Sequence, residues 1–302
     1  MANVRREYLP DLDALPMHVI EDLSWRDYGQ WTLFTSRGCP FRCTFCSSAA
    51  FWRHSLRCQS PRRVYEEIIR LQRDYGARDI YIADDTFTAD RARTEQICRL
   101  LIEHDTKVRW SCLTRADCLT PQLVQLMANA GCVLISFGME TSADETLALV
   151  RKQMKSIKLA DALAWCKSEH VRTRVSCIFG LPGETQTDVR LTIEFLLKNQ
   201  PDEIQLYGLT PHDGTMLFGD LENLGIRVLE SDPTLWSRNV LSPVCETEAL
   251  PRQTIMDLAR ECIQRLQQRG YTYLSDGLQR RKIGAPKTVA TSFSPVQSIG
   301  GV

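Results

Sequence analysis

Short apolar runs alternate along the chain with longer segments in which apolar residues recur at helical spacing. Six runs have the length and composition of buried strands, and the segments between them are typical of covering helices. The predicted strands cover residues 32–36, 79–84, 108–113, 132–138, 172–180 and 203–209. The predicted helices cover about 61–75, 90–104, 121–130, a broken segment over 143–169, then 186–198 and 252–268.

Polar residues mark where several of these helices begin. A serine or threonine followed by proline is typical of an N-cap with proline at the first helical position. A serine or threonine followed three residues later by an acidic residue is typical of a capping box. The first pattern occurs at Ser60-Pro61 and Thr120-Pro121, and the second at Ser142 with Glu145 and at Thr185 with Asp188.

Six β–α units in series predict a parallel sheet covered by helices. Right-handed crossovers leave two architectures open, a doubly wound sheet and a barrel, and periodicity does not choose between them. Both place ligands at the carboxyl ends of the strands. We therefore expect one shared site there. The conspicuous residues at those ends are Gly38-Cys39, Asp84-Asp85, Arg115, Glu140, Gly180 to Glu184, and Thr210 to Gly214.

Composition narrows the class of protein. The chain has 302 residues, of which 43% are hydrophobic and 25% charged, as in an ordinary soluble protein. Equal numbers of basic and acidic residues argue against nucleic-acid and membrane partners. No apolar run approaches the roughly 20 residues that span a bilayer. Residues 1–16 lack the apolar core of a secretory signal, so we expect a cytoplasmic protein.

Twelve cysteines are many for such a protein. A disulfide framework is disfavoured, because a chain of this size does not need such support and shows no export signal. Most of the cysteines stand singly in apolar stretches, where we interpret them as small buried hydrophobic residues. These are Cys98, Cys112, Cys132, Cys166 and Cys177.

One tight cysteine cluster remains, in the segment SRGCPFRCTFCSS after the first strand. Cys39, Cys43 and Cys46 are separated by three and two residues, and thiolates this close can bind three irons of one cubane cluster. A closed cluster or zinc site would need a fourth nearby ligand, whereas Cys58 lies twelve residues further on. One metal would then keep an open position. A zinc-binding loop and three buried thiols are the alternatives.

The sequence CPFRCTFC resembles the Cys-x3-Cys-x-aromatic-Cys signature of the radical S-adenosylmethionine (SAM) superfamily. The resemblance implies that the three cysteines hold a 4Fe–4S cluster whose fourth iron is chelated by SAM. It also implies that Phe45 lies against the adenine. Reductive cleavage of SAM would give a 5′-deoxyadenosyl radical that removes hydrogen from the substrate. A reductant such as flavodoxin or ferredoxin would supply the electrons.

Two strand ends resemble the family's polar SAM-binding motifs. By this resemblance Asp84 and Asp85 contact the methionine amino group, and Glu140 accepts hydrogen bonds from the ribose hydroxyls. Each has a simpler alternative. The aspartates also suit a turn that caps the next helix, and Glu140 also suits the N-terminus of the helix that follows it.

The later strand ends offer further SAM contacts. In CIFGLPGET, which loosely resembles a glycine-containing family motif, Gly180 and Gly183 would let the backbone approach the adenine. A plain proline–glycine turn is the alternative. Arg115 or Arg174 could pair bidentately with the SAM carboxylate, and surface ion pairs are the alternative for both. The basic run from Arg53 to Arg63 suits either a solvated face or an anionic substrate.

Together the motifs, over about residues 31–216, resemble the branch of the family that carries a cobalamin-binding domain before the radical SAM core. Only about thirty residues precede the first strand, whereas such a domain needs on the order of 100. We therefore expect this chain to lack it, with any corrinoid supplied by a separate protein. Cys245 and Cys262 are too few for a second cluster.

The resemblance implies an α/β fold, a partial (β/α)6 TIM-like barrel of radical SAM type. The expected parts are a leader at 1–30, the core barrel at 31–225, a C-terminal helical region at 226–282 and a loose tail at 283–302. The expected reaction is hydrogen abstraction from a small-molecule substrate, leading to rearrangement, oxidation or cyclisation. A methyl or group transferase working with a separate corrinoid protein, and a non-catalytic metal-binding domain, are the alternatives.

Overall fold

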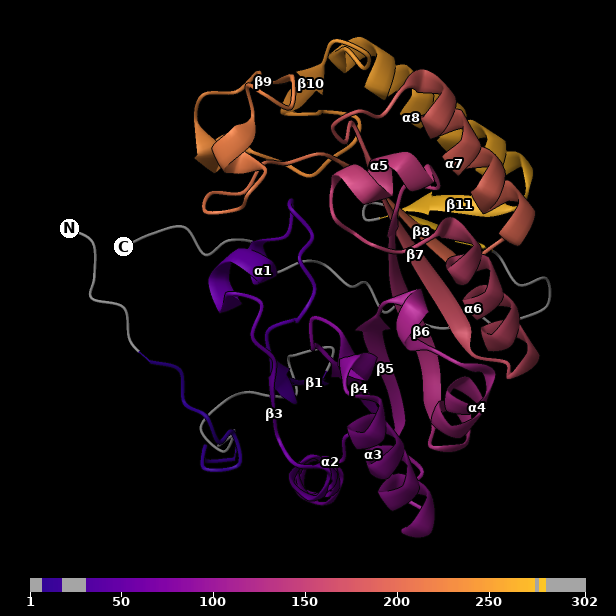
Figure 1. The fold of residues 1–302 in the computed structure, drawn as a ribbon. Helices are drawn as coiled ribbons and strands as arrows, with labels where there is room; N and C mark the ends of the chain where they lie inside the picture. The colour runs from indigo at the N-terminus through magenta and orange to yellow at the C-terminus, as the bar shows by residue number, and fades with distance from the viewer. Residues whose placement is uncertain (1–6, 18–30, 275–276, 281–302) are drawn as a thin grey trace.

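A mixed sheet of eight strands forms the centre of the computed structural model, which describes residues 7–17, 31–274 and 277–280 (Figure 1). Six strands are parallel and follow one another in chain order. They are β1 (Trp31–Leu33), β4 (Asp79–Ile82), β5 (Arg109–Thr114), β6 (Cys132–Glu140), β7 (Arg172–Phe179) and β8 (Glu203–Gly208). All six predicted strands are confirmed.

The strand order decides between the two architectures that the sequence left open. A doubly wound sheet reverses its strand order at a switch point, whereas here each strand pairs with the next without reversal. A barrel has this strand order. The barrel is partial, because β1 and β8 do not pair with each other. The predicted fold class is confirmed.

Short strands complete the structure. An antiparallel hairpin, β11 (Tyr271–Leu274) and β12 (Gly277–Arg280), joins the sheet at the edge of β8. The region after residue 225 thus contributes strands as well as the predicted helix. Two small ribbons pair β2 (Ser36–Arg37) with β3 (Arg57–Cys58), and β9 (Ile226–Val228) with β10 (Cys245–Thr247). The predicted tail at 283–302 lies outside the described residues.

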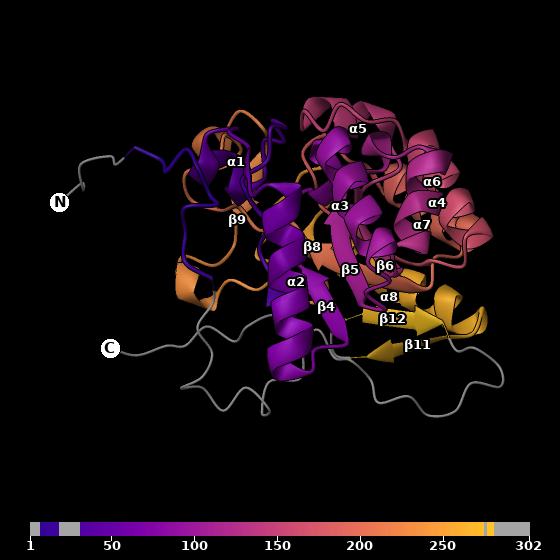
Figure 2. The ribbon, with the colours of Figure 1, turned by 90° about the horizontal axis from the view of Figure 1, so that it is seen from below.

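The α-helices are α1 (Ser47–Trp52), α2 (Pro61–Tyr75), α3 (Arg91–Glu103), α4 (Pro121–Asn129), α5 (Asp144–Leu149), α6 (Ser156–Ser168), α7 (Gln186–Asn199) and α8 (Arg252–Gln268). Single 3-10 turns occur at Phe87–Ala89, Ala116–Cys118, Phe218–Asp220 and Pro233–Leu235. Helices α2, α3, α4, α6 and α7 follow the outer face of the sheet, whereas α1 lies beside the β9–β10 segment (Figure 2). No helix in the described part of the chain is both long and apolar enough to span a membrane.

Three of the predicted helix starts are confirmed. The Ser60 hydroxyl accepts a hydrogen bond from the Arg63 amide, and the Thr120 hydroxyl accepts one from Leu123. Thr185 and Asp188 form a capping box. In each case the partner lies three residues further along, so local sequence is enough to predict the bond.

The predicted capping box at Ser142 is wrong. Helix α5 starts at Asp144 without a side-chain cap. The Ser142 amide instead donates to the hydroxyl of Thr192, on α7. A residue fifty positions away therefore sets the path of the chain after β6, which the local pattern could not indicate.

The main core lies between the sheet and the outer helices. Its largest fully buried side chain is Trp110, whose indole nitrogen donates to the Ala130 carbonyl at 2.8 Å. The singly placed cysteines are buried in this core, as predicted: Cys98, Cys112, Cys132, Cys166 and Cys177. Burial of these apolar side chains is the main stabilising contribution to such a fold.

Candidate active site

The three clustered cysteines lie in the loop between β2 and α1. Cys39, Cys43 and Cys46 are all half-buried, and Cys46 is the N-cap of α1. Gly38 opens the loop with φ of +88°, and a Cβ there would stand 2.1 Å from the Ser55 carbonyl oxygen. Only glycine fits this position, so the residue before Cys39 fixes the path of the loop.

Bonds from distant parts of the chain hold the loop against the carboxyl ends of the strands. The Ser48 hydroxyl donates to Asp85, after β4, at 2.6 Å. The Cys39 sulfur lies 3.4 Å from the Thr86 hydroxyl. The Thr44 amide donates to the Val150 carbonyl at 3.0 Å. The structure thus brings Asp85 to the cysteine loop, as predicted from strand polarity.

Cys43 lies against two cationic side chains. Arg115 Nη1 stands 3.8 Å from the Cys43 sulfur, and its guanidinium lies 3.8 Å from the centre of the Phe41 ring. Asp117 binds Arg115 at 2.7 and 3.0 Å, which fixes its orientation. Burial raises the pKa of the Cys43 thiol, although Lys152 and Arg115 both act to lower it. Metal binding would therefore displace a proton from this thiol.

Glu140 ends β6 with a left-handed φ of +69°. Its carboxylate accepts from Lys152 Nζ at 2.7 Å, and the two side chains are only 10% and 6% exposed. A Cβ at Gly138 would stand 2.4 Å from the Glu140 carboxylate, so this glycine leaves room for it. The predicted ribose acceptor is therefore already half of a buried ion pair, and sequence reasoning missed its partner Lys152.

Asp84 has a different place from the one predicted. Its carboxylate is buried and accepts from the amides of Thr35 and Ser36 at 2.7 and 2.9 Å, and from the Thr35 hydroxyl. Arg93 donates to the same threonine. Asp84 thus joins the end of β4 to the bend after β1, and the structure does not turn it toward the cysteines.

A turn that contains Gly180 and Gly183 follows the end of β7. Gly180 and Gly183 have φ of +91° and +75°, the left-handed region that glycine tolerates. Glu184 accepts from the Gly180 amide at 2.9 Å and is fully buried. Leu181 packs in a small apolar cluster with Phe45, so the residue beside the third cysteine reaches this strand end. The predicted adenine contacts lie close together.

Arg174 is not part of this group. It lies in the first half of β7 and forms an ion pair with Glu203, the first residue of β8. Arg172 pairs with the same carboxylate. The structure therefore separates Arg174 from the cysteine loop and leaves Arg115 as the arginine beside it.

Glu184→Gln is expected to change how stability depends on pH. Burial raises the pKa of Glu184 to about 8, although the Gly180 amide acts to lower it. The folded state keeps a proton that the unfolded state loses near pH 4.5. The contribution of Glu184 to the free energy of unfolding is therefore complete below about pH 4.5. Between there and about pH 8 it decreases by about 1.4 kcal/mol per pH unit. Glutamine keeps the acceptor and has no proton to lose.

Urea unfolding of both proteins from about pH 5 to pH 9 measures the effect. The stability of the natural protein relative to Glu184→Gln should fall as the pH rises through this range. A relative stability that stays constant would show that Glu184 is ionised in the folded protein, and would contradict the prediction.

The three thiols of the cysteine loop have the chemistry of cluster ligands. Among the described residues, no three His, Cys, Asp or Glu side chains are grouped so that they could share one metal ion. A cubane cluster does not require this, because each thiolate binds a different iron. The three half-buried thiols and the neighbouring cations of Arg115 and Lys152 suit a cluster that carries negative charge.

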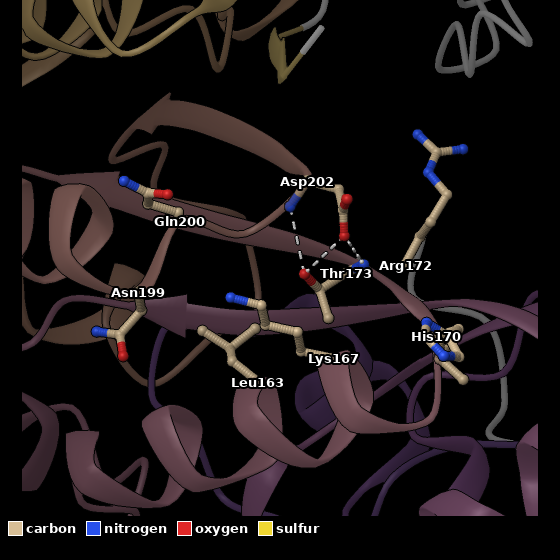
Figure 3. Close-up of a pocket in the computed structure, with 9 residues that line it drawn as sticks. Leu163, Lys167, His170, Arg172, Thr173, Asn199, Gln200 and Asp202 are labelled. Atoms are coloured by element: carbon tan, nitrogen blue, oxygen red, sulfur yellow. Dashed lines mark hydrogen bonds between the residues drawn. The ribbon is translucent and has the colours of Figure 1, made fainter. Parts of the chain in front are cut away.

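A separate cavity of about 200 Å³ lies at the other end of the strands (Figure 3). It lies between the starts of β7 and β8 and the ends of α6 and α7, with Lys167, His170 and Gln200 in its lining. Asp202 accepts from the Thr173 amide and hydroxyl there. Ligands of such barrels bind at the carboxyl ends of the strands, so we assign the chemistry to the cysteine end.

The profile of the radical SAM superfamily matches residues 33–196, more than half of the chain. The chain belongs to the radical SAM superfamily. This membership confirms the predictions that it is an enzyme and that its cofactors are a 4Fe–4S cluster and SAM. The predicted metal ligands and SAM contacts remain assignments to individual residues, which are taken up below.

Several curated proteins are similar in sequence. An uncharacterized methyltransferase of Pyrococcus horikoshii is 32% identical over 216 residues, which cover 72% of this chain and 46% of that protein. The anaerobic magnesium-protoporphyrin IX monomethyl ester cyclase of Cereibacter sphaeroides is 29% identical over 226 residues, covering 74% and 36%. The chain thus spans less than half the length of these two relatives.

Solved structures show the same fold. The radical SAM methyltransferase TsrM of Kitasatospora setae, with tryptophan and a SAM analogue bound, superposes with a TM-score of 0.65 at 16% identity. The match covers 79% of this chain and 52% of that one. Coproporphyrinogen III oxidase of Escherichia coli gives a TM-score of 0.59 at 17% identity, covering 83% and 55%.

Proposed function

We propose that Cys39, Cys43 and Cys46 bind three irons of the 4Fe–4S cluster and leave the fourth iron to SAM. The observation that carries the proposal is the placement of these three thiols, in one loop, against the carboxyl ends of β4 and β5. When bound, the cluster supplies the electron that breaks the sulfonium carbon–sulfur bond of SAM.

The surrounding residues have distinct parts in this proposal. Arg115, held by Asp117, keeps a positive charge beside the Cys43 thiolate and stabilises its ionised form. Asp85, bonded to Ser48, offers a carboxylate to the SAM ammonium group. Gly180 supplies the left-handed turn that ends β7 and packs closely on Ile255, and the backbone of this turn, beside Leu181 and Phe45, is offered to the adenine ring.

The proposed reaction is hydrogen abstraction from an unactivated carbon of a small molecule, followed by rearrangement, oxidation or cyclisation. Similarity to a magnesium-protoporphyrin ester cyclase supports this class. The second candidate is transfer of a methyl group with a corrinoid. Similarity to methyltransferases favours it, and TsrM has been solved with cobalamin as well as a [4Fe–4S] cluster bound. In that case a corrinoid is a further cofactor of the reaction.

Anaerobic reconstitution tests the proposal. The protein should bind about four irons, absorb broadly near 400 nm, and cleave SAM when reduced. Release of 5′-deoxyadenosine without cobalamin supports hydrogen abstraction. S-adenosylhomocysteine that forms only when cobalamin is added supports methyl transfer. Protein that takes up no iron and leaves SAM intact would overturn both candidates.

A further inference from the structure

The stretch of chain that carries the cysteine loop is strongly basic. Residues 28–65 contain six arginines and no aspartate or glutamate, although the whole chain has 37 basic and 37 acidic residues. The last two of these arginines, Arg62 and Arg63, form ion pairs with α2. The uncompensated charge is therefore concentrated on the residues around the loop and α1.

Three arginines, two from this stretch and one from the turn after α5, have no acidic partner among the described residues. Arg42, Arg53 and Arg151 are exposed, and none takes part in an ion pair within the described residues. Arg151 comes from the turn after α5, and its Nη1 lies 3.8 Å from the sulfur of Met216. Segments far apart in the sequence thus add positive charge on the same side of the molecule.

A cavity of about 220 Å³ leads from this surface to the cysteines. Its lining includes Cys43, Cys46, Arg53, His54 and Met216. The residues assigned to SAM at the ends of β4, β6 and β7 do not line it. The cavity therefore approaches the cysteine loop from a side that the proposed SAM site leaves free.

The backbone turns two polar side chains toward this cavity. Helix α1 ends at Trp52 and is followed by Arg53 and His54, which both have left-handed φ, of 51° and 58°. Two successive non-glycine residues in this region are uncommon and cost conformational energy. The His54 ring bonds back to the Phe41 carbonyl at 3.1 Å, which ties the turn to the cysteine loop.

Two exposed apolar side chains lie near Arg53. Phe51, on α1, is 68% exposed, and Met216, which lines the cavity with Arg53, is 46% exposed. A small exposed apolar area beside positive charges suits a transient electron-transfer complex, which buries little surface and relies on electrostatic steering.

We propose that the mouth of this cavity, formed by Arg53, His54 and Met216, docks a small acidic electron-donor protein together with two exposed residues next to it in the chain, Arg42 of the cysteine loop and Phe51 of α1. The proposal rests on the proposed function, because a radical SAM cluster needs one electron from outside for each reductive cleavage. In this step the donor loses one electron and the cluster gains it, and no bond forms or breaks. The positive face attracts the acidic donor and brings it to the side of the loop where Cys43 and Cys46 meet the cavity.

Charge reversal tests the docking surface. The variant Arg42→Glu/Arg53→Glu is compared with Arg78→Glu/Arg269→Glu, which changes the net charge equally at two exposed arginines elsewhere. The probe is reduced flavodoxin, an acidic protein. Two quantities are measured, the affinity of flavodoxin for the protein and the rate of cluster reduction. Methyl viologen, a small cationic reductant, drives the same reduction without docking.

At about 10 mM ionic strength, Arg42→Glu/Arg53→Glu should weaken flavodoxin binding and slow flavodoxin-driven reduction at least about tenfold. The control variant should change both less than about twofold. For the natural protein, about 0.3 M salt should remove most of the flavodoxin rate advantage. Reduction by methyl viologen should not slow in any of the three proteins, because the introduced glutamates attract a cationic reductant rather than repel it.

Unchanged flavodoxin affinity in Arg42→Glu/Arg53→Glu would overturn the docking surface. So would a flavodoxin rate that does not respond to salt, or an equal slowing with both reductants. The binding measurement does not depend on catalysis. If methyl viologen drives no SAM cleavage in the natural protein, the proposed function fails, whereas the docking surface is still judged by affinity.

Discussion

Cys43→Ala is expected to abolish both cluster binding and SAM cleavage while the barrel stays folded. The reason is that Cys43 is one of three thiols in the loop, and two thiolates cannot hold the cluster in the arrangement that leaves one iron open. The side chain is half-buried and small, so its loss should cost only about 1 kcal/mol of folding free energy. Iron analysis, the absorbance near 400 nm and circular dichroism measure these effects.

Cys58→Ala is the matched control. Cys58 is also a half-buried free thiol of the same chain segment, but it lies in β3, outside the loop. This variant should keep about four irons and its SAM cleavage. An unfolded Cys43→Ala protein would instead indicate a structural metal. A Cys43→Ala protein that still cleaves SAM would contradict the assignment of the ligand.

Lys152→Met is expected to destabilise the fold by about 3–5 kcal/mol, because it leaves the Glu140 carboxylate buried without its cation. Both partners are at most 10% exposed, so water does little to replace the lost charge. Lys155→Met, at an exposed lysine three residues away, should change stability by less than about 0.5 kcal/mol. Urea unfolding of the three proteins gives these differences.

The double variant Glu140→Gln/Lys152→Met distinguishes the cost of burying an unpaired charge from any other role of these two side chains. It removes both charges, so it should recover most of the stability lost in Lys152→Met. If Glu140 also binds the ribose, as the family resemblance implies, the KM for SAM should rise in the double variant while the cluster is retained. A double variant as unstable as Lys152→Met would contradict the assigned role of the ion pair.

Local sequence was enough to predict what depends on neighbouring residues. The six parallel strands follow from short apolar runs, and the caps at Ser60, Thr120 and Thr185 follow from partners three residues away. Strand polarity also placed Asp85, Glu140 and Gly180 at one end of the sheet. The order of the strands, which distinguishes a barrel from a doubly wound sheet, needed the structure.

Partnerships across strands could not be predicted. Arg174 pairs with Glu203 because these two residues lie opposite each other in the register of β7 and β8. That register cannot be read from a single sequence. Lys152 reaches Glu140 because the chain turns back after α5, with left-handed φ at Arg151 and Gln153. Neither turn residue is glycine, so no local signal marked the turn.

The contacts of Thr44 set an order of events during synthesis of the protein. This residue, between two of the cysteines, bonds to Val150 and accepts from the amide of Leu217, which the ribosome adds 173 residues later. The cysteines therefore emerge long before the segments that fix their positions. Because amino-terminal regions start to fold first, the loop waits for the rest of the barrel. A chain cut before residue 217 would present its thiols in a loop without the Leu217 bond that helps to position it.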